Sequence, residues 1–164
     1  MFHEWFASKK KASCVEAAAP VSGTLLPLCD VPDEVFARGF TGAAIEPSEG
    51  LAVAPFDGRV IHLIHTGHAI IVEHQSGLQL LIHIGINTVN LKGRGFNVLV
   101  QAGDRVRTGQ RLIEFDLKLL RQAGFHATTL IVVINEQGVD MQVGKYRQVR
   151  ASEPVFRIAM NKFQ

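Results

Sequence analysis

The sequence has no hydrophobic run that could cross a membrane, because none approaches the roughly 18 apolar residues that a spanning helix needs. A secretory signal is also missing, since the amino-terminal stretch MFHEWFASKKKASC contains no central apolar segment. These two absences lead us to expect a cytoplasmic protein.

A strong charge of one sign is absent as well. Lysine and arginine number 17 against 15 acidic residues, which leaves a net charge of +2. This even balance, without a long basic stripe, argues against nucleic acid as a partner. Cysteine is scarce: Cys14 and Cys29 have neither metal-like nor redox-like spacing. They fit free thiols in a reducing compartment, and one disulfide remains the alternative.

The composition is that of a globular protein, with 47% hydrophobic and 20% charged residues in a chain of 164. This length suits one core. We expect residues 17–164 to form a single domain and residues 1–16 to form a flexible tail. An alternative for the tail is weak contact with a membrane surface, with its aromatic rings inserted and Lys9–Lys11 above anionic lipid.

Short apolar segments rich in β-branched residues, each bounded by turn residues, predict a chain made mostly of strands. These segments are residues 21–28, 50–64, 68–74, 78–86, 96–116, 128–135 and 153–160. Residues 116–124 predict a short helix, with Asp116 as its cap and Gly124 at its end. We therefore predict an all-β fold, an antiparallel sandwich or barrel-like structure with one or two short helices.

A histidine interrupts the most regular of these strands, LQLLIHIGI. The period of two places Leu78, Leu80, Ile82 and Ile84 on one face, which is the obvious core side. His83 then points to the other face, together with Gln79, Leu81 and Gly85. An ionisable side chain at such a position is either a satisfied structural histidine or a working group held by a rigid sheet.

A second histidine is expected beside the first. If residues 68–83 fold into a hairpin with a loop of two or four residues, His68 and His83 lie directly opposite each other, about 4.5–5.5 Å apart at Cβ. Ile70 and Leu81 pair beneath them. A three-residue loop would shift the register by one and separate the two rings. Neighbouring imidazoles disfavour a second proton, so both rings are expected to be neutral at pH 7 and able to attack phosphorus or bind a metal.

Two longer stretches give these histidines a context. The stretch VAPFDGRVIHLIHTGHAIIVEHQSGLQLLIHIGINTVNLKGRGF, followed by VQAGDRVRTGQRLIEFD, resembles the glucose-type enzyme IIA domain of the bacterial phosphoenolpyruvate-dependent sugar phosphotransferase system. The similarity extends from about Ala18 to Ile158. The resemblance implies the duplicated hybrid motif of that family. It also implies a phosphocarrier that works with a separate permease, while any regulatory protein clients and the sugar served remain open.

By this resemblance, His83 is the phosphorylated histidine and His68 its partner in the active site, with Thr66 hydrogen-bonded in the same cluster. Phospho-HPr, a small histidine phosphocarrier, would supply the phosphoryl group, and a cysteine of a IIB domain would receive it. We expect Nδ1 of His83 to donate to a backbone carbonyl around Gly85, which leaves Nε2 to attack. His68 would donate to a phosphoryl oxygen. No cofactor is required, although His68 and His83 could bind adventitious or partner-assisted zinc.

An apolar rim around the histidines is expected to receive these partners. By matching positions, it comprises Val35, Phe36, Phe40, Ile64, Leu81 and Val89. Core packing is the alternative for each, and is as strong as the docking role for Val35 and Ile64. Phe36 and Phe40 are the better candidates because the segment DEVFARGF mixes them with charge.

The sequence departs from the family in three places. Asn87 stands where aspartate is usual, which removes a negative charge beside a site that meets basic partners. Glu34 replaces an apolar residue, and Gly42–Ala44 lacks the usual acid.

Two other classes share parts of the pattern. A lysostaphin-type zinc peptidase needs three protein ligands, including a late His-x-His, but only His126 follows His83. A biotinyl or lipoyl carrier needs a lysine in a particular turn, and the context of Lys92 is wrong for one.

Overall fold

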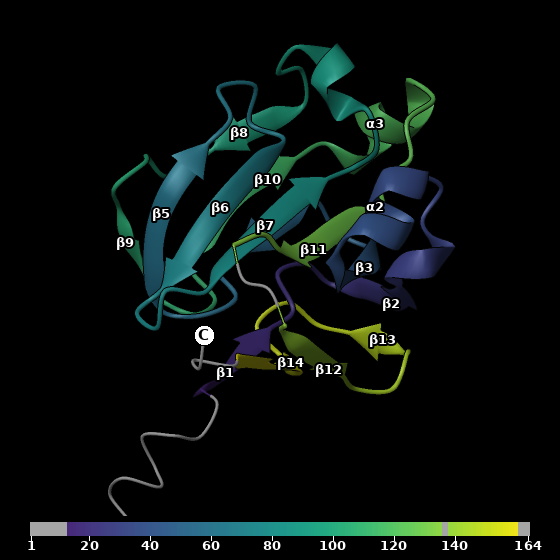
Figure 1. The fold of residues 1–164 in the computed structure, drawn as a ribbon. Coiled ribbons are helices and arrows are strands. Elements are labelled where there is room, and N and C mark those ends of the chain that lie inside the picture. The colour runs from purple at the N-terminus through teal and green to yellow at the C-terminus, as the bar shows by residue number, and fades with distance from the viewer. Residues whose placement is uncertain (1–12, 136–137, 161–164) are drawn as a thin grey trace, which may run out of the picture.

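The computed structural model describes residues 13–135 and 138–160. Within these ranges strands dominate, and the helices are short (Figure 1). The strands are β1 (Ser13–Ala18), β2 (Gly23–Pro27), β3 (Thr41–Pro47), β4 (Leu51–Val53), β5 (Gly58–Leu63), β6 (Ala69–His74), β7 (Gln79–Ile84), β8 (Phe96–Val98), β9 (Arg105–Val106), β10 (Arg111–Phe115), β11 (Thr129–Val133), β12 (Asp140–Val143), β13 (Gln148–Val149) and β14 (Pro154–Met160). The helices are the α-helices α2 (Glu34–Gly39) and α3 (Leu117–Gln122) and the 3₁₀ helices η1 (Leu28–Asp30) and η2 (Thr88–Leu91).

The strands form three antiparallel sheets, as the sequence predicts. The largest has eight strands in the order β13-β2-β3-β11-β7-β6-β5-β9 and curves around the molecule. Two sheets of three strands, β4-β10-β8 and β1-β14-β12, complete the structure. In Figure 1 the first of these lies behind the large sheet and the second lies below it.

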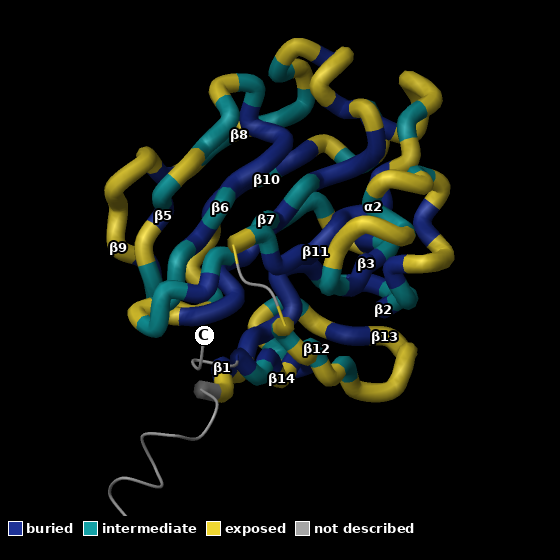
Figure 2. Tube along the Cα trace, viewed as in Figure 1, coloured by how far each residue is buried: buried dark blue, intermediate teal, exposed yellow. Residues whose placement is uncertain are grey.

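The main core lies inside the curve of the large sheet. Leu80, Ile82 and Ile84 of β7 are fully buried there, which confirms the predicted apolar face of this strand. A second cluster lies on the outer face of the same sheet, where Leu130 and Val132 of β11 pack under η1 and α2. Strand β11 is therefore buried on both faces, and it is dark blue along its length in Figure 2. This strand is the direct neighbour of β7, which carries His83.

Helix α3 matches the predicted helix. The Asp116 carboxylate accepts a hydrogen bond from the Leu119 N–H (3.0 Å), and Gly124 follows with a φ of +89°. Helix α2 was not predicted from its sequence. Its cap is Asp33, whose carboxylate accepts from the N–H groups of Val35 and Phe36. The prediction of one or two short helices agrees with these two α-helices.

One boundary differs from the prediction, and one strand was not predicted. Strand β1 begins at Ser13 and pairs with β14, so the tail does not extend to residue 16. Residues 1–12, which hold the rest of the predicted tail and its possible membrane contact, lie outside the described residues. Strand β3 was missed because Thr41–Pro47 is rich in alanine and glycine, which have low strand propensity.

The β6–β7 hairpin has a different register from the predicted one. Its loop has three residues, 75–77, and Gly77 provides the positive φ of +96° that such a loop uses. Ala69, not His68, lies opposite His83, and Ile71, not Ile70, lies opposite Leu81. The predicted pairing of His68 with His83 is therefore wrong by one residue.

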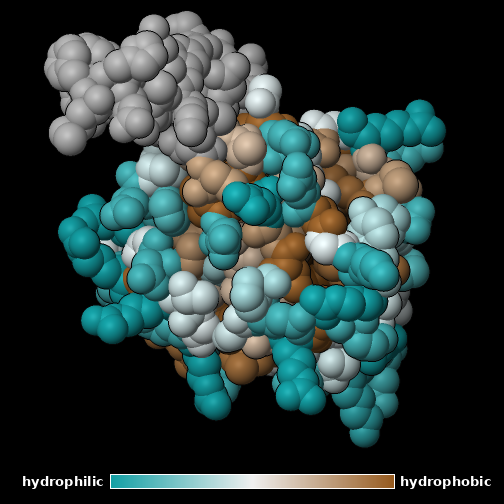
Figure 3. Space-filling view, turned by 90° about the horizontal axis from the view of Figure 1, so that it is seen from below, coloured by the Kyte–Doolittle hydropathy of each residue, from teal (hydrophilic) through white to brown (hydrophobic). Residues whose placement is uncertain are grey.

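The surface is polar with apolar breaks. Viewed from below in Figure 3, hydrophilic side chains project around the edge and apolar surface is exposed between them. Within the described ranges, no helix is both long and apolar enough to span a membrane.

Candidate functional site

His83 lies on the outer face of the large sheet, near the end of β7. Its neighbours across the two adjacent strands are Ala69 of β6 and Leu130 of β11. Leu130 is fully buried, and the ring of Phe36 from α2 lies 5.6 Å from the His83 ring, centroid to centroid. His83 itself is half-buried, so its imidazole is held against an apolar wall while part of it reaches solvent.

Gly85 fixes the orientation of the His83 ring. Nδ1 of His83 lies 2.8 Å from the carbonyl oxygen of Gly85 and donates to it, as the sequence predicts. Gly85 has a φ of +79°, a conformation that favours glycine, and its N–H donates to the carbonyl of Thr128 (3.1 Å). A Cβ on Gly85 would lie 2.4 Å from Cγ2 of Thr88, so the space also requires glycine. The proton is thereby held on Nδ1, and the lone pair is on Nε2.

His68 reaches the same face from a bend that precedes β6. Gly67 turns the chain with a φ of +80°, and the His68 carbonyl accepts from the Ile84 N–H (2.7 Å). Because His68 is not part of the regular strand, the alternation of side chains does not apply to it. Only the methyl group of Ala69 lies directly opposite His83, which leaves room for the His68 ring.

The two imidazoles meet despite the shifted register. Their ring centroids are 5.1 Å apart and their planes are nearly perpendicular, at 78°. The expectation that a three-residue loop would separate them is therefore wrong. His68 is 3% exposed, and its Nδ1 lies 2.8 Å from the Thr66 hydroxyl, in agreement with the hydrogen bond expected of Thr66. The ring of Phe96, at 6.3 Å, also lies beside His68.

Burial keeps both rings neutral. Burial, reinforced by the neighbouring charges of His83 and His65, lowers the pKa of His68 to about 4 from an ordinary value of 6.5. Burial also lowers the pKa of His83, against the raising effects of the Gly85 carbonyl and the Asp33 carboxylate. At neutral pH the site therefore presents two uncharged imidazoles, one of which has a free lone pair.

The residues predicted to form the docking rim divide into two groups. Val35, Phe40 and Val89 are exposed, at 68%, 39% and 52%, which excludes core packing for them. Phe36, Ile64 and Leu81 are half-buried. The rings of Phe36 and Phe40 stack at 5.3 Å, so an apolar surface continues outward from His83.

Asn87 lies beyond this rim, at the start of η2. It is exposed, with a φ of 60° and a ψ of 20°, and its side chain makes no capping hydrogen bond to η2. Asparagine tolerates this left-handed conformation. Its amide is uncharged, whereas the Asp33 carboxylate acts on His83 and raises the pKa of the imidazole.

The protein ligands available for a metal are few. Within residues 13–135 and 138–160, no group of three histidine, cysteine or acidic residues could hold a metal ion. His68 and His83 offer two imidazole nitrogens, whereas a catalytic zinc site needs three protein ligands.

Comparison with known proteins shows the family to which this chain is similar. Residues 15–139 match the family described as phosphoenolpyruvate-dependent sugar phosphotransferase system, EIIA 1. The chain belongs to this family.

Individual relatives agree with this assignment. The EIIA chain is 38% identical over 142 residues to a glucose-specific EIIA component from Bacillus cereus, covering 85% of this chain and 86% of that protein. It is 38% identical over 155 residues to a glucose-specific EIICBA component from Staphylococcus saprophyticus, covering 93% of this chain and 23% of that longer protein. The solved glucose permease IIA from Mycoplasma capricolum superimposes with a TM-score of 0.82 at 30% identity, covering 88% of this chain and 96% of that one.

The EIIA chain is therefore a phosphotransferase system component, a phosphocarrier in sugar uptake. Neither the peptidase nor the biotinyl-type alternative is favoured. Three residues near the histidines were not predicted from the sequence: Asp33, Phe96 and Gly67. A signal existed for Asp33, since an aspartate before a short charged and apolar segment is a typical helix cap.

Proposed function

We propose that this chain accepts a phosphoryl group from phospho-HPr on Nε2 of His83 and passes it to a cysteine in the IIB domain of a sugar permease, in the cytoplasm. One observation carries the proposal: Nδ1 of His83 donates to the Gly85 carbonyl at 2.8 Å, which leaves the Nε2 lone pair free. Several relatives are named as glucose-specific, so glucose is the first sugar to test.

The reaction is a transfer between two imidazoles. The Nε2 lone pair of His83 forms a bond to phosphorus as the N–P bond in phospho-HPr breaks, and the electron pair of that bond stays on the HPr ring. Nδ1 of His83 keeps its proton, and the Gly85 carbonyl stabilises the positive charge that the ring gains. The phosphorylated ring can then yield its phosphoryl group to a thiolate, because an N–P bond to imidazole has a high transfer potential.

His68 serves as the hydrogen-bond donor to the transferred group. The Thr66 hydroxyl donates to its Nδ1, so the proton of the neutral ring is on Nε2. That N–H is available to a phosphoryl oxygen on the neighbouring His83. Burial matters here, because a fixed donor in a site with little water stabilises charge more strongly than one in solution.

Partners would dock on the apolar rim of Val35, Phe36, Phe40 and Val89 together with Ile64 and Leu81. Its exposed members lie on α2, directly after it and in η2, and the His83 ring is next to Phe36. A partner that adds a carboxylate could also complete a zinc site with His68 and His83, whereas the chemistry of transfer needs no metal.

Labelling with phosphoenolpyruvate tests the proposal. The chain is incubated with labelled phosphoenolpyruvate, enzyme I and HPr, and we expect a label that is stable to alkali and labile to acid. The variant His83→Ala should take up no label, while His62→Ala, which removes an exposed histidine of β5, should label at the wild-type rate. Labelling of His83→Ala would refute the assignment of the nucleophile.

A further inference from the structure

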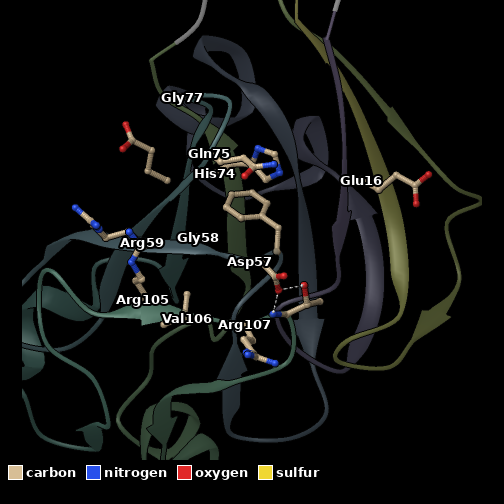
Figure 4. A pocket seen from close by; sticks show the side chains of 13 residues that line it. Glu16, Asp57, Gly58, Arg59, His74, Gln75, Gly77, Arg105, Val106 and Arg107 are labelled. Atoms are coloured by element: carbon tan, nitrogen blue, oxygen red, sulfur yellow. Dashed lines mark hydrogen bonds between the residues drawn. The ribbon is translucent and has the colours of Figure 1, made fainter.

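A cleft with a volume of about 780 Å³ lies away from the histidine pair, at the other end of the β6–β7 hairpin (Figure 4). Strand β6 begins one residue after His68 and ends at His74, which lines the cleft. The start of β5, strand β9, the loop that follows it and Glu16 of β1 form the remaining walls. The volume is within the range typical of small-molecule sites.

Two arginines lie side by side in this cleft. Arg59 of β5 and Arg105 of β9 are direct cross-strand partners, so their side chains share one face, and Figure 4 shows them next to each other. Like charges in such a pair are destabilising. In the described part of the chain, neither guanidinium group has an ion pair or a hydrogen bond, and the same holds for Arg107, which also lines the cleft. The two guanidinium groups therefore face each other without a direct ion-pair partner in this part of the chain.

The nearby acids have other hydrogen-bond partners. Glu73 lies opposite Arg59 on the neighbouring strand, but its carboxylate accepts from the side-chain amide of Gln79 (3.0 Å). Asp57 accepts from the backbone N–H and the hydroxyl of Thr108, at 2.8 and 3.0 Å. Glu16 lines the far side of the cleft and its side chain points away from the two arginines, so among these three acids no carboxylate neutralises the pair by direct contact.

We propose that this cleft binds a small monophosphorylated polyhydroxy compound, of the sugar phosphate class. The phosphate lies between Arg59 and Arg105, because guanidinium groups match phosphate oxygens in geometry and charge. The hydroxyl groups donate to the carboxylate of Glu73 and contact the amide of Gln75. The carboxylates of Glu73 and Asp57 repel an extended polyanion such as an acidic peptide, so a compact ligand with one anionic group fits best.

Calorimetric titration of the full chain tests this site. The probes are glucose 6-phosphate, inorganic phosphate and glucose, each in a buffer without phosphate and at concentrations up to about 10 mM. The variants are Arg59→Gln and Arg105→Gln, and the control is Arg111→Gln, which removes an exposed arginine outside the cleft. Removing one of two facing positive charges should not unfold the protein, and thermal unfolding of each variant checks this.

We expect glucose 6-phosphate to bind the wild type more tightly than inorganic phosphate, and glucose alone not to bind. Each cleft variant should weaken the binding of glucose 6-phosphate at least about tenfold, and the control variant by less than about twofold. Three results would overturn the proposal: no binding of glucose 6-phosphate by the wild type, binding that both cleft variants retain, or equal affinity for inorganic phosphate.

Discussion

The unfolding free energy of this protein should decrease as the pH falls from about 6.5 to about 4, because of His68. In the folded chain the pKa of this buried imidazole is lowered to about 4, and in the unfolded chain it returns to about 6.5. Between these values the unfolded state binds more protons than the folded state. Stability therefore rises with pH in this window, is complete above about 6.5, and is lost as the pH falls toward 4.

The size of the effect follows from the same two values. At about 1.4 kcal/mol per pKa unit, the difference between 6.5 and about 4 corresponds to roughly 3 kcal/mol. Because His68 is 3% exposed, little of this is removed by solvent screening. The loss is large beside the total stability of about 5–15 kcal/mol that is usual for a domain.

Urea denaturation at a series of pH values measures the effect. Carboxylates and other histidines also titrate in this range, so the informative quantity is the difference between the wild type and His68→Gln. The glutamine keeps a polar group near Thr66 but does not titrate. Between about pH 7.5 and about pH 4, the wild type should lose roughly 3 kcal/mol more than the variant. His62→Gln, in which the replaced histidine is exposed, should follow the wild type.

Parallel pH profiles for the wild type and His68→Gln would refute this reasoning. A second measurement uses the wild type alone and therefore remains informative if the variant does not fold. The ring resonances of His68 in the native wild type should not titrate near pH 6.5, and a midpoint there would show that burial does not hold the imidazole neutral.

Three further outcomes concern transfer and geometry. In His68→Gln, His83 should still accept phosphate while onward transfer to a IIB domain slows about 100-fold in rapid-mixing assays; wild-type rates for both steps would make His68 purely structural. Asn87→Asp should raise the rate of phosphoryl transfer with basic partners roughly two- to tenfold at low salt and not at high salt. An unchanged rate would contradict the proposed electrostatic effect of this position. Gly85→Ala should lower the urea-derived unfolding free energy by about 2–4 kcal/mol, from its positive φ and the clash with Thr88. In the matched variant Gly103→Ala, the φ is similar but the added Cβ contacts nothing, so the unfolding free energy should fall by only about 1–2 kcal/mol. Equal losses in the two variants would contradict the predicted clash with Thr88.

The pattern of apolar residues was sufficient to predict the strand that carries His83. The period of two in residues 78–84 assigns Leu80 and Ile82 to the core and His83 to the other face, and burial agrees. The cap at Asp116 was equally clear, because a side-chain acceptor before an apolar turn acts locally. Both features depend only on neighbours in the sequence.

The register of the hairpin and the position of β3 depend on tertiary contacts and could not be read in this way. One glycine, Gly77, selects a three-residue loop and shifts every cross-strand pair by one. Strand β3 contains Gly42, Ala43 and Ala44, and glycine is needed at position 42 because a Cβ there would lie 2.2 Å from the carbonyl oxygen of Ile131. Glycine and alanine have low strand propensity, so the residues that this close packing requires give no strand signal in the sequence.

The double-sided burial of β11 makes the proposed nucleophile and the proposed docking rim differ in how freely they can change. His83, the proposed nucleophile, lies on a strand whose neighbour is enclosed in two apolar clusters, so moving its ring would cost much stability. The outermost side chains of the proposed docking rim come from α2, which buries no residue, and from exposed positions such as Val89. Substitutions at these positions cost little stability, so on the proposed function a new permease could be accommodated over evolutionary time while His83 stays in place.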